Sequence, residues 1–449
     1  MATDRLNART EALLRRLVRR DAASALRKLL ARTRPSDIAA AMEHLTWAEQ
    51  RRLYRLIDED DYAAEVLAHL SGDSSREITR EMTEEQVVAL IDRMEPDDAT
   101  DLVSALPEEL RARVLQELGA EEDVRELLAW PRDTAGGLMT PQVFCMPDTA
   151  TCGQAIAALQ ANDEHLETVY YVYVVDNVRA LIGVTSLRSL LTSPPRTPLV
   201  SIMTRDVIRV SPAEDQEEVA RFVARYDLLA IPVVDEHSRI LGVVTVDDVV
   251  DVIREEAAED MLRMAGVVED ERQASVVRQS WTRAGWLLAT IGGGILAAEI
   301  IGLYEETLTR VAVLAGFIPV IMGMGGNVGI QSATLAVRGL ATGSVQIGGA
   351  FGFVWREARV GVVLGLLYAL LLGTYGVLRY PGQPLIGVSV ATSIGMAIAL
   401  AAVIGACIPI GLSRGGVDPA IATGPFVTTL VDVLGIIVYF NVARLLLTL

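Results

Sequence analysis

The sequence is poor in the residues that build disulfide frameworks and zinc sites. It has three cysteines, Cys145, Cys152 and Cys407, and four histidines in 449 residues. An odd, sparse set of cysteines without a CxxC pair excludes a disulfide scaffold and a structural zinc site. The sequence also has no P-loop, no nucleophile–base pair and no metal-hydrolase motif, so an enzyme is not expected.

Basic residues are also in deficit, and they are unevenly distributed. The chain has 40 Lys and Arg against 58 Asp and Glu, a formal net charge of −18. Residues 271–449 carry ten arginines and seven acids, a net charge of +3, so the first 270 residues carry −21. Such an acidic region disfavours nucleic acid and anionic lipid as partners and favours cations. The alternative is that acidity only keeps a soluble region in solution.

The first residues lack the apolar core of a signal peptide, so we expect the first part of the chain to be cytosolic. Leucine and alanine recur at helical spacing through residues 1–130. Residues 37–45 and 98–106 resemble each other, and each is followed by a second amphipathic segment. This pattern predicts helical hairpins stacked as a small solenoid.

A clearer repeat follows the helical region. Residues 138–143 match residues 202–207, and residues 181–185 match residues 240–244. Each unit alternates helical and β-rich runs. The repeat therefore predicts an α/β module duplicated in tandem, with one copy over residues 131–195 and the other over residues 196–253.

The duplicated module resembles a pair of cystathionine-β-synthase (CBS) domains, regulatory modules that often bind adenine nucleotides. The second copy carries the family's Thr-x-x-Asp ribose motif at Thr245 and Asp248. The first copy departs from the motif, with Arg188 where the acid would stand. The resemblance thus implies at most one nucleotide site per chain, with ATP as the candidate ligand.

A charged helix is predicted from Thr245 to Val268, because its apolar positions keep helical spacing between many acids. We assign residues 254–275 as a connecting helix between the duplicated module and the rest of the chain. Such a helix either transmits a signal or is only a solvated linker.

Residues 276–449 contain five long apolar runs. Each is roughly 20 residues or longer, which suffices to cross a bilayer. They cover residues 286–304, 311–337, 360–378, 385–412 and 420–443, and glycine and proline interrupt the second and fifth. Most arginines fall on one side of these runs, namely Arg272, Arg278, Arg283, Arg338, Arg356, Arg359 and Arg414, against Arg310, Arg379 and Arg444. The positive-inside rule then places the N-terminal region in the cytosol and the C-terminus outside.

An aspartate, Asp432, lies inside the fifth run, and no basic residue is nearer in sequence than Arg444. A carboxylate at bilayer depth is costly unless it lines water, pairs or binds a cation, so we predict a cation path. Asp418 precedes it by 14 residues, about 21 Å along an ideal helix and on nearly the same face. Thr428 and Gly435, about one turn to either side of Asp432, leave room for a hydrated ion.

The second run contributes two amides, Asn327 and Gln331, at the spacing of one helical face. The alternative is that its glycines pack helices and its amides join them. All the proposed ligands are oxygen atoms, which favours Mg²⁺ or Ca²⁺, although Mn²⁺ and Co²⁺ remain open. A few carboxylates acting through a hydration shell suit Mg²⁺. Two chains about a two-fold axis would bring two copies of Asp432 to one divalent cation.

Residues 317–334 and 418–432 resemble the signatures of the MgtE family of magnesium channels. The resemblance covers the whole chain, with Ile330 as a departure. It implies a multidomain membrane protein with a solenoid-like α-helical N domain, tandem α/β CBS domains and a five-helix all-α transmembrane domain. It also implies a homodimer in the lipid bilayer of the bacterial cytoplasmic (inner) membrane, whose pore conducts Mg²⁺ with Asp432 as its central ligand.

The family further implies that cytosolic Mg²⁺ closes the pore by neutralising acids in the soluble part. The matching acids are Asp215, Glu217, Asp227, Asp248, Asp251, Glu256, Glu259 and Asp260, with Asp97, Asp98 and Asp101 as candidates in the N domain. Two other functions are weighed against this one. One is a secondary transporter of divalent cations coupled to H⁺ or Na⁺, with Asp432 binding the proton. The other is a membrane-anchored nucleotide sensor without transport.

Overall fold

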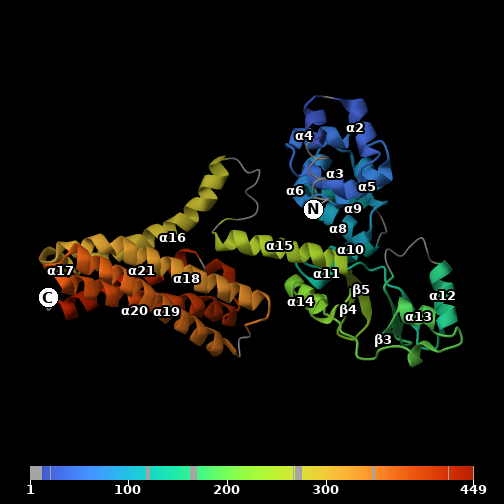
Figure 1. Cartoon of the computed structure of the whole chain (residues 1–449). Coiled ribbons are helices and arrows are strands. Elements are labelled where there is room, and N and C mark those ends of the chain that lie inside the picture. The colour runs from blue at the N-terminus through green and yellow to red at the C-terminus, as the bar shows by residue number, and fades with distance from the viewer. Residues whose placement is uncertain are drawn as a thin grey trace. The chain divides into compact units, whose positions relative to one another are not determined.

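The computed structural model describes residues 13–20, 22–117, 122–161, 169–265, 267, 276–345, 349–422 and 424–447 (Figure 1). Contacts divide the chain into two compact units, residues 1–253 and residues 254–449. Residue 266 and residues 268–275 of the predicted connecting segment, which include Arg272, lie outside the described residues.

Short helices build the first part of unit 1. They are α2 (Ala23–Leu30), α3 (Pro35–Met42), α4 (Trp47–Tyr54), α5 (Asp60–Ala68), α6 (Gly72–Thr79), α7 (Glu84–Ile91), α8 (Pro96–Ala105), α9 (Glu108–Glu117) and α10 (Glu122–Leu127). Each of α3 to α7 packs against the next helix but one, as in a solenoid. The two similar sequence stretches form α3 and α8, which both begin with proline. The predicted helical solenoid is therefore confirmed.

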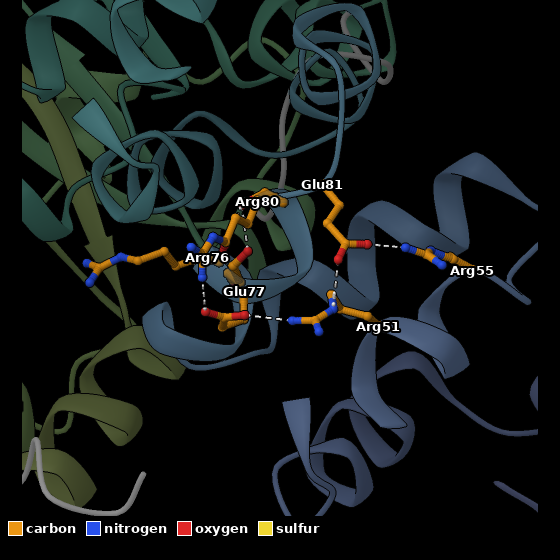
Figure 2. Close-up of polar contacts among 8 residues, drawn as sticks. Arg51, Arg55, Arg76, Glu77, Arg80 and Glu81 are labelled. Carbon is orange, nitrogen blue, oxygen red and sulfur yellow. Dashed lines mark hydrogen bonds and ion pairs between the residues drawn. The ribbon is translucent and has the colours of Figure 1, made fainter. Parts of the chain in front are cut away.

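Ion pairs join neighbouring layers of this solenoid. Arg51 on α4 lies 2.7 Å from Glu77 on α6 and 3.4 Å from Glu81, and Arg55 also pairs with Glu81 (Figure 2). Because these side chains are partly or fully exposed, each pair contributes only about 0–1 kcal/mol. The solenoid is held mainly by its buried core, which includes Ile38 and Leu53.

The duplicated module follows as two matching halves. The first has α11 (Ala135–Leu138), β1 (Cys145–Pro147), α12 (Cys152–Ala161), β2 (Tyr171–Val175), β3 (Leu181–Ser186) and α13 (Leu187–Thr192). The second has η1 (Leu199–Ser201), α14 (Gln216–Tyr226), β4 (Ala230–Val234), β5 (Ile240–Thr245) and α15 (Val246–Met264). The β2–β3 and β4–β5 pairs are antiparallel, and each has a register shift at the equivalent place. This confirms the tandem α/β duplication.

The two halves exchange their first segments. Thr140 of the first half pairs with Val243 of β5, and Thr204 of the second half pairs with Val184 of β3. A Cβ at Gly242 would lie 2.9 Å from the Met139 sulfur, and a Cβ at Gly183 would lie 2.4 Å from the Met203 sulfur. An added side chain would displace the methionine of the other half at both glycines, and at Gly242 it would also lie 2.7 Å from the Thr140 carbonyl oxygen.

The strands correct one detail of the ribose motif. β3 ends at Ser186 and β5 ends at Thr245, so these two residues are equivalent. Asp248 lies three residues after Thr245, so its equivalent lies three residues after Ser186 and is Ser189. The prediction of Arg188 was wrong, because it aligned the two halves with a displacement of one residue. The Ser189 hydroxyl lies 2.9 Å from that of Ser186, and the first half still lacks an acid.

Five helices in the described part of unit 2 are long and apolar enough to cross a membrane, as predicted. They are α16 (Val276–Gly302), α18 (Ile318–Ala341), α19 (Ala350–Arg379), α20 (Pro384–Arg414) and α21 (Pro425–Leu446), and α17 (Glu305–Arg310) and η3 (Ala312–Phe317) follow α16. These helices lie alongside one another in Figure 1. The glycines of the second run do not break α18, because a glycine inside a helix keeps its backbone hydrogen bonds.

Candidate ion path and acidic site

Asp432 lies in α21, and its side chain is partly buried beside α18. A Cβ at Gly326 of α18 would lie 3.9 Å from Asp432 Oδ1 and 3.9 Å from Thr428 Cγ2. The missing side chain of Gly326 therefore leaves space beside the carboxylate. The Thr428 hydroxyl donates to the Gly424 carbonyl at 3.1 Å, so its oxygen remains available as an acceptor.

The face of α18 next to Gly326 carries the two predicted amides. Asn327 and Gln331 are both exposed in the single chain, while Val328 and Gly329 are buried. Gly435 is placed differently from Thr428. It is buried, and a Cβ there would lie 3.8 Å from Ile321. Gly435 therefore belongs to helix packing, and Gly326 is the glycine beside Asp432.

Asp418 and Asp432 do not share one helix, which corrects the predicted alignment of the two acids. Asp418 precedes the short η5 (Pro419–Ala422), and α21 begins only at Pro425. Proline lacks the amide hydrogen that a continuous helix needs, so the helix begins at Pro425. The Asp418 carboxylate accepts from the Ala420 amide at 2.8 Å and from Arg263 Nη1 at 2.5 Å.

In unit 1, the first turns of α8 and α15 bring acids together. Burial raises the pKa of Asp98 to about 7, and the charges of Glu95 and Asp248 add to the rise. Burial, with Asp97 and Asp247 nearby, likewise raises the pKa of Asp248 to about 7. The pKa of Asp97 rises to about 7 through burial and the charge of Asp98. The Oδ1 atom of Asp97 is buried without a hydrogen-bond partner in the described structure.

The other predicted acids have different surroundings. Asp101 pairs with Arg132 at 2.7 Å, Glu217 pairs with Arg221 at 3.0 Å, and Glu259 pairs with Arg263. Asp215 caps α14 by accepting from the Glu217 amide at 2.8 Å, and Asp227 ends α14 in a left-handed conformation. Asp251, Glu256 and Asp260 also have polar or electrostatic partners.

Within the described ranges, no three His, Cys, Asp or Glu side chains converge as a closed metal site. The carboxylates of α8 and α15 interact through their charges without closing on one point. This arrangement suits an ion that keeps part of its water shell, as Mg²⁺ does, better than one held by protein atoms alone.

The two residues of the predicted ribose motif are in contact, and one of them also belongs to the acidic site. The Thr245 hydroxyl donates to Asp248 Oδ2 at 2.6 Å, so the two residues of the motif are in contact. Asp248 is also one of the acids that face α8. The two predicted functions of Asp248 therefore compete for one carboxylate.

Two residues of unit 2, which contains the five long apolar helices and is called the membrane unit below, escaped prediction. Glu357 of α19 is 4 % exposed and accepts a hydrogen bond from Ser332 of α18 at 3.0 Å. The sequence did contain a signal for Glu357. It precedes Gly361 by four residues and Gly365 by eight, which is the spacing of one helical face, and α19 buries that face. Gly326 was also missed as a neighbour of Asp432, because its position depends on how α18 packs against α21.

Three family models match the chain. The divalent cation transporter model MgtE matches residues 318–442, the MgtE intracellular N domain matches residues 33–133, and the CBS domain matches residues 199–255. These ranges fall within the helical bundle, the solenoid and the second half of the duplicated module.

Curated relatives are similar over nearly the whole chain. "Magnesium transporter MgtE" of Thermus thermophilus is 37% identical over 431 residues, which cover 94% of this chain and 95% of the relative. "Magnesium transporter MgtE" of Bacillus subtilis is 32% identical over 422 residues and 93% of each chain.

Two solved structures are similar to about half of the chain. "Crystal structure of the soluble part of a magnesium transporter" is 30% identical, covers 56% of this chain and 99% of its own, and has a TM-score of 0.48. "Crystal structure of the cytosolic domain of the Mg2+ channel MgtE in complex with ATP" is 33% identical, covers 54% and 99%, and has a TM-score of 0.46.

Proposed function

This chain belongs to the MgtE family of magnesium transporters, and from that membership we propose that it forms a Mg²⁺-selective channel closed by cytosolic Mg²⁺. The observation that carries the proposal is Asp432, a partly buried carboxylate in a spanning helix that faces Gly326, which has no side chain to cover it. A charge at this depth needs water or a cation. In the proposed path Asp432 attracts the hydrated ion, and Thr428, Asn327 and Gln331 supply neutral oxygen atoms.

Mg²⁺ flux into liposomes tests the pore. We expect the full chain to admit Mg²⁺ down its own gradient, and Asp432→Asn to lower the flux at least about tenfold, which corresponds to about 1.4 kcal/mol. Glu305→Gln removes an exposed acid at the end of the bundle and should leave the flux unchanged. Equal flux through the Asp432→Asn protein would refute the pore assignment. A strict need for an H⁺ or Na⁺ gradient would instead establish coupled transport.

We assign pore closure to the acids of α8 and α15. Without a divalent cation, Asp97, Asp98 and Asp248 repel one another in a buried setting. Mg²⁺ held between them would offset that repulsion and stabilise the arrangement in which the solenoid contacts the second half of the duplicated module. Asp98→Asn removes one repelling charge and one ligand of the ion, so it should favour closure without Mg²⁺ and reduce the further effect of Mg²⁺ on the flux. A parent-like flux without Mg²⁺, together with an unchanged threshold (the cytosolic Mg²⁺ concentration that halves the flux), would exclude this site.

A second copy of the chain would complete the path. Asn327 and Gln331 are exposed in one chain, and only 6% of the most apolar stretch of α16 is buried. A homodimer in the cytoplasmic membrane, with the N-terminus in the cytosol and the C-terminus outside, would cover part of these surfaces. The mass of the detergent-solubilised protein and the labelling of cysteines placed at each terminus test both points. A strictly monomeric, active protein would contradict the dimer.

ATP is the proposed ligand of the second half of the duplicated module. The support is the contact between Thr245 and Asp248, the two residues of the ribose motif. Thr245→Val separates the two functions of Asp248, because it removes the hydroxyl and keeps the carboxylate. We expect this variant to bind ATP more weakly with an unchanged Mg²⁺ threshold. Equal ATP binding by both proteins would exclude the motif as the site.

A further inference from the structure

Glu357 is a buried carboxylate in the membrane unit that the proposed ion path does not use. It lies on α19 between Phe353 and Gly361, on the helix face that also buries Ala350 and Gly365. The residue is 4 % exposed. A carboxylate buried among apolar side chains is costly unless it is hydrogen-bonded or paired, so its partners identify what it does.

The partners of Glu357 come from two directions. Ser332 of α18, which is 3 % exposed, donates its hydroxyl to Glu357 Oε2 at 3.0 Å. Arg356 Nε lies 3.7 Å from Glu357 Oε1, and the guanidinium also stacks over the Phe353 ring at 5.0 Å from its centre. The carboxylate therefore joins a hydroxyl of the neighbouring helix to a cation of its own helix.

Near this point α18 approaches α20 and α21 at glycine, beside the buried side chains of Val328 and Ala333. A Cβ on Gly405 of α20 would lie 2.2 Å from the Gly329 carbonyl oxygen, and a Cβ on Gly329 would lie 3.1 Å from Val427. Small residues at a helix contact let the two backbones approach closely and leave few protruding side chains there. A directional hydrogen bond such as Ser332–Glu357 adds a restraint on rotation, because it weakens steeply when its angle changes.

We propose that Glu357 is a positioning residue for ion transport, which fixes the rotation of α18 by accepting the hydrogen bond of Ser332. Successive residues of a helix are about 100° apart, so Gln331 points to the side of α18, about a quarter turn from the direction in which Ser332 meets Glu357. The same rotation places Asn327 on the exposed face and Gly326 beside Asp432. This inference rests on the proposed function, because it assigns that face of α18 to the ion path.

A double-mutant cycle in Mg²⁺ flux tests the hydrogen bond. We expect Ser332→Ala and Glu357→Ala each to lower the flux about tenfold, and the double variant to be no worse than either, because all three remove one shared contact. Glu357→Gln should keep most of the flux, since its amide oxygen still accepts from Ser332. Effects that multiply in the double variant, or a Glu357→Gln protein as impaired as Glu357→Ala, would overturn the proposal.

Thiol labelling tests the rotation without relying on transport. In a background without native cysteines, a cysteine replacing Gln331 should react several-fold more slowly with a charged reagent after Ser332→Ala, and one replacing Val328 should react faster. Unchanged rates at both positions would overturn the proposal even if flux fell. If the parent protein moved no Mg²⁺ but the labelling shift appeared, the proposed function would fail while the restraint on α18 stood.

Matched controls separate positioning from general damage. Glu305→Gln removes an exposed carboxylate of α17, and Thr392→Ala removes an exposed hydroxyl of α20 that bonds its own backbone at 2.9 Å. Both should leave flux and labelling unchanged. A variant is compared with the parent only if it elutes as a single species in size-exclusion chromatography and unfolds at nearly the same temperature. If the two control substitutions shifted the labelling as Ser332→Ala does, the effect would not belong to the Ser332–Glu357 bond.

Discussion

At the scale of single residues, two glycines of the membrane unit do different work. Gly326 faces the Asp432 carboxylate, where an added Cβ would make only ordinary contacts at 3.9 Å. Gly405 meets the backbone of α18, where a Cβ would lie 2.2 Å from the Gly329 carbonyl oxygen. The first glycine therefore leaves the Asp432 carboxylate uncovered on the side of the proposed ion path, and the second allows two helices to approach.

Alanine substitution should separate these two roles. Gly405→Ala should lower the unfolding midpoint in detergent, because forcing packed helices apart costs about 1–3 kcal/mol. Gly326→Ala should leave the midpoint close to that of the parent and still reduce Mg²⁺ flux, because a methyl group narrows the space beside Asp432. Thermal unfolding and liposome flux, measured on the same preparations, check both expectations. A normal flux through the Gly326→Ala protein would remove this glycine from the ion path.

At the scale of secondary structure elements, the facing N-termini of α8 and α15 form the acidic site. Each helix carries two acids in its first turn, Asp97 and Asp98 on α8 and Asp247 and Asp248 on α15. A helix N-terminus favours negative charge, but burial and mutual repulsion outweigh that benefit here. The pKa of three of these carboxyl groups consequently rises to about 7.

These pKa values make the contact between the two helices pH-dependent. An unfolded aspartate has a pKa of about 3.9, so the folded site binds more protons than the unfolded chain between that value and about 7. The contribution of these carboxyl groups to the stability of the contact is therefore most favourable below pH 4. It falls as the pH rises toward 7 and stays low above pH 7. Without Mg²⁺, hydrogen exchange of the peptides covering α8 and the start of α15 should be faster at pH 8 than at pH 5.

Both added Mg²⁺ and the substitution Asp98→Asn should restore the stability that the contact between α8 and α15 loses at high pH. Added Mg²⁺ should slow the exchange of these peptides strongly at pH 8 and weakly at pH 5, where protons already neutralise the site. Asp98→Asn should slow the exchange at pH 8 without Mg²⁺ and reduce the further effect of the ion. A response to Mg²⁺ of equal size at both pH values would contradict the assignment of these acids.

At the scale of the whole molecule, the separation of charge organises the protein. The first 270 residues carry a net charge of −21, and the remaining residues carry +3. Strong net charge of one sign destabilises a compact state because the charges repel one another. Bound divalent cations reduce this repulsion. The acidic region is thus suited to sense the ion that the membrane unit transports.

Limited proteolysis of the full chain tests this coupling. We expect cleavage within the first 270 residues to slow progressively as Mg²⁺ is added. NaCl at matched ionic strength should protect much less, because screening alone does not bridge carboxylates. The Asp432→Asn protein should be protected like the parent, since its substitution lies in the other unit. Equal protection by Na⁺ and Mg²⁺ would reduce the effect to general screening.

The sequence by itself determined the list of elements and supplied the candidate residues of the proposed ion path. Helical spacing, the tandem repeat and the long apolar runs depend on local pattern, and they predicted the solenoid, the duplicated module and five spanning helices. Asp432 was found in the same way, because an acid in a spanning run is costly wherever it packs. Register errors remained where the pattern was short, as with Arg188 and Ser189.

Only the tertiary structure decided which residues meet. The meeting of α8 and α15 joins Asp98 to Asp248 across about 150 residues of chain, and no local pattern contains that information. The break before Pro425 separated Asp418 from Asp432, and helix packing assigned Gly326 to the carboxylate and Gly435 to the core. Glu357 and Ser332 became partners for the same reason. Such contacts between distant segments depend on the three-dimensional packing of the helices, which short-range periodicity does not specify.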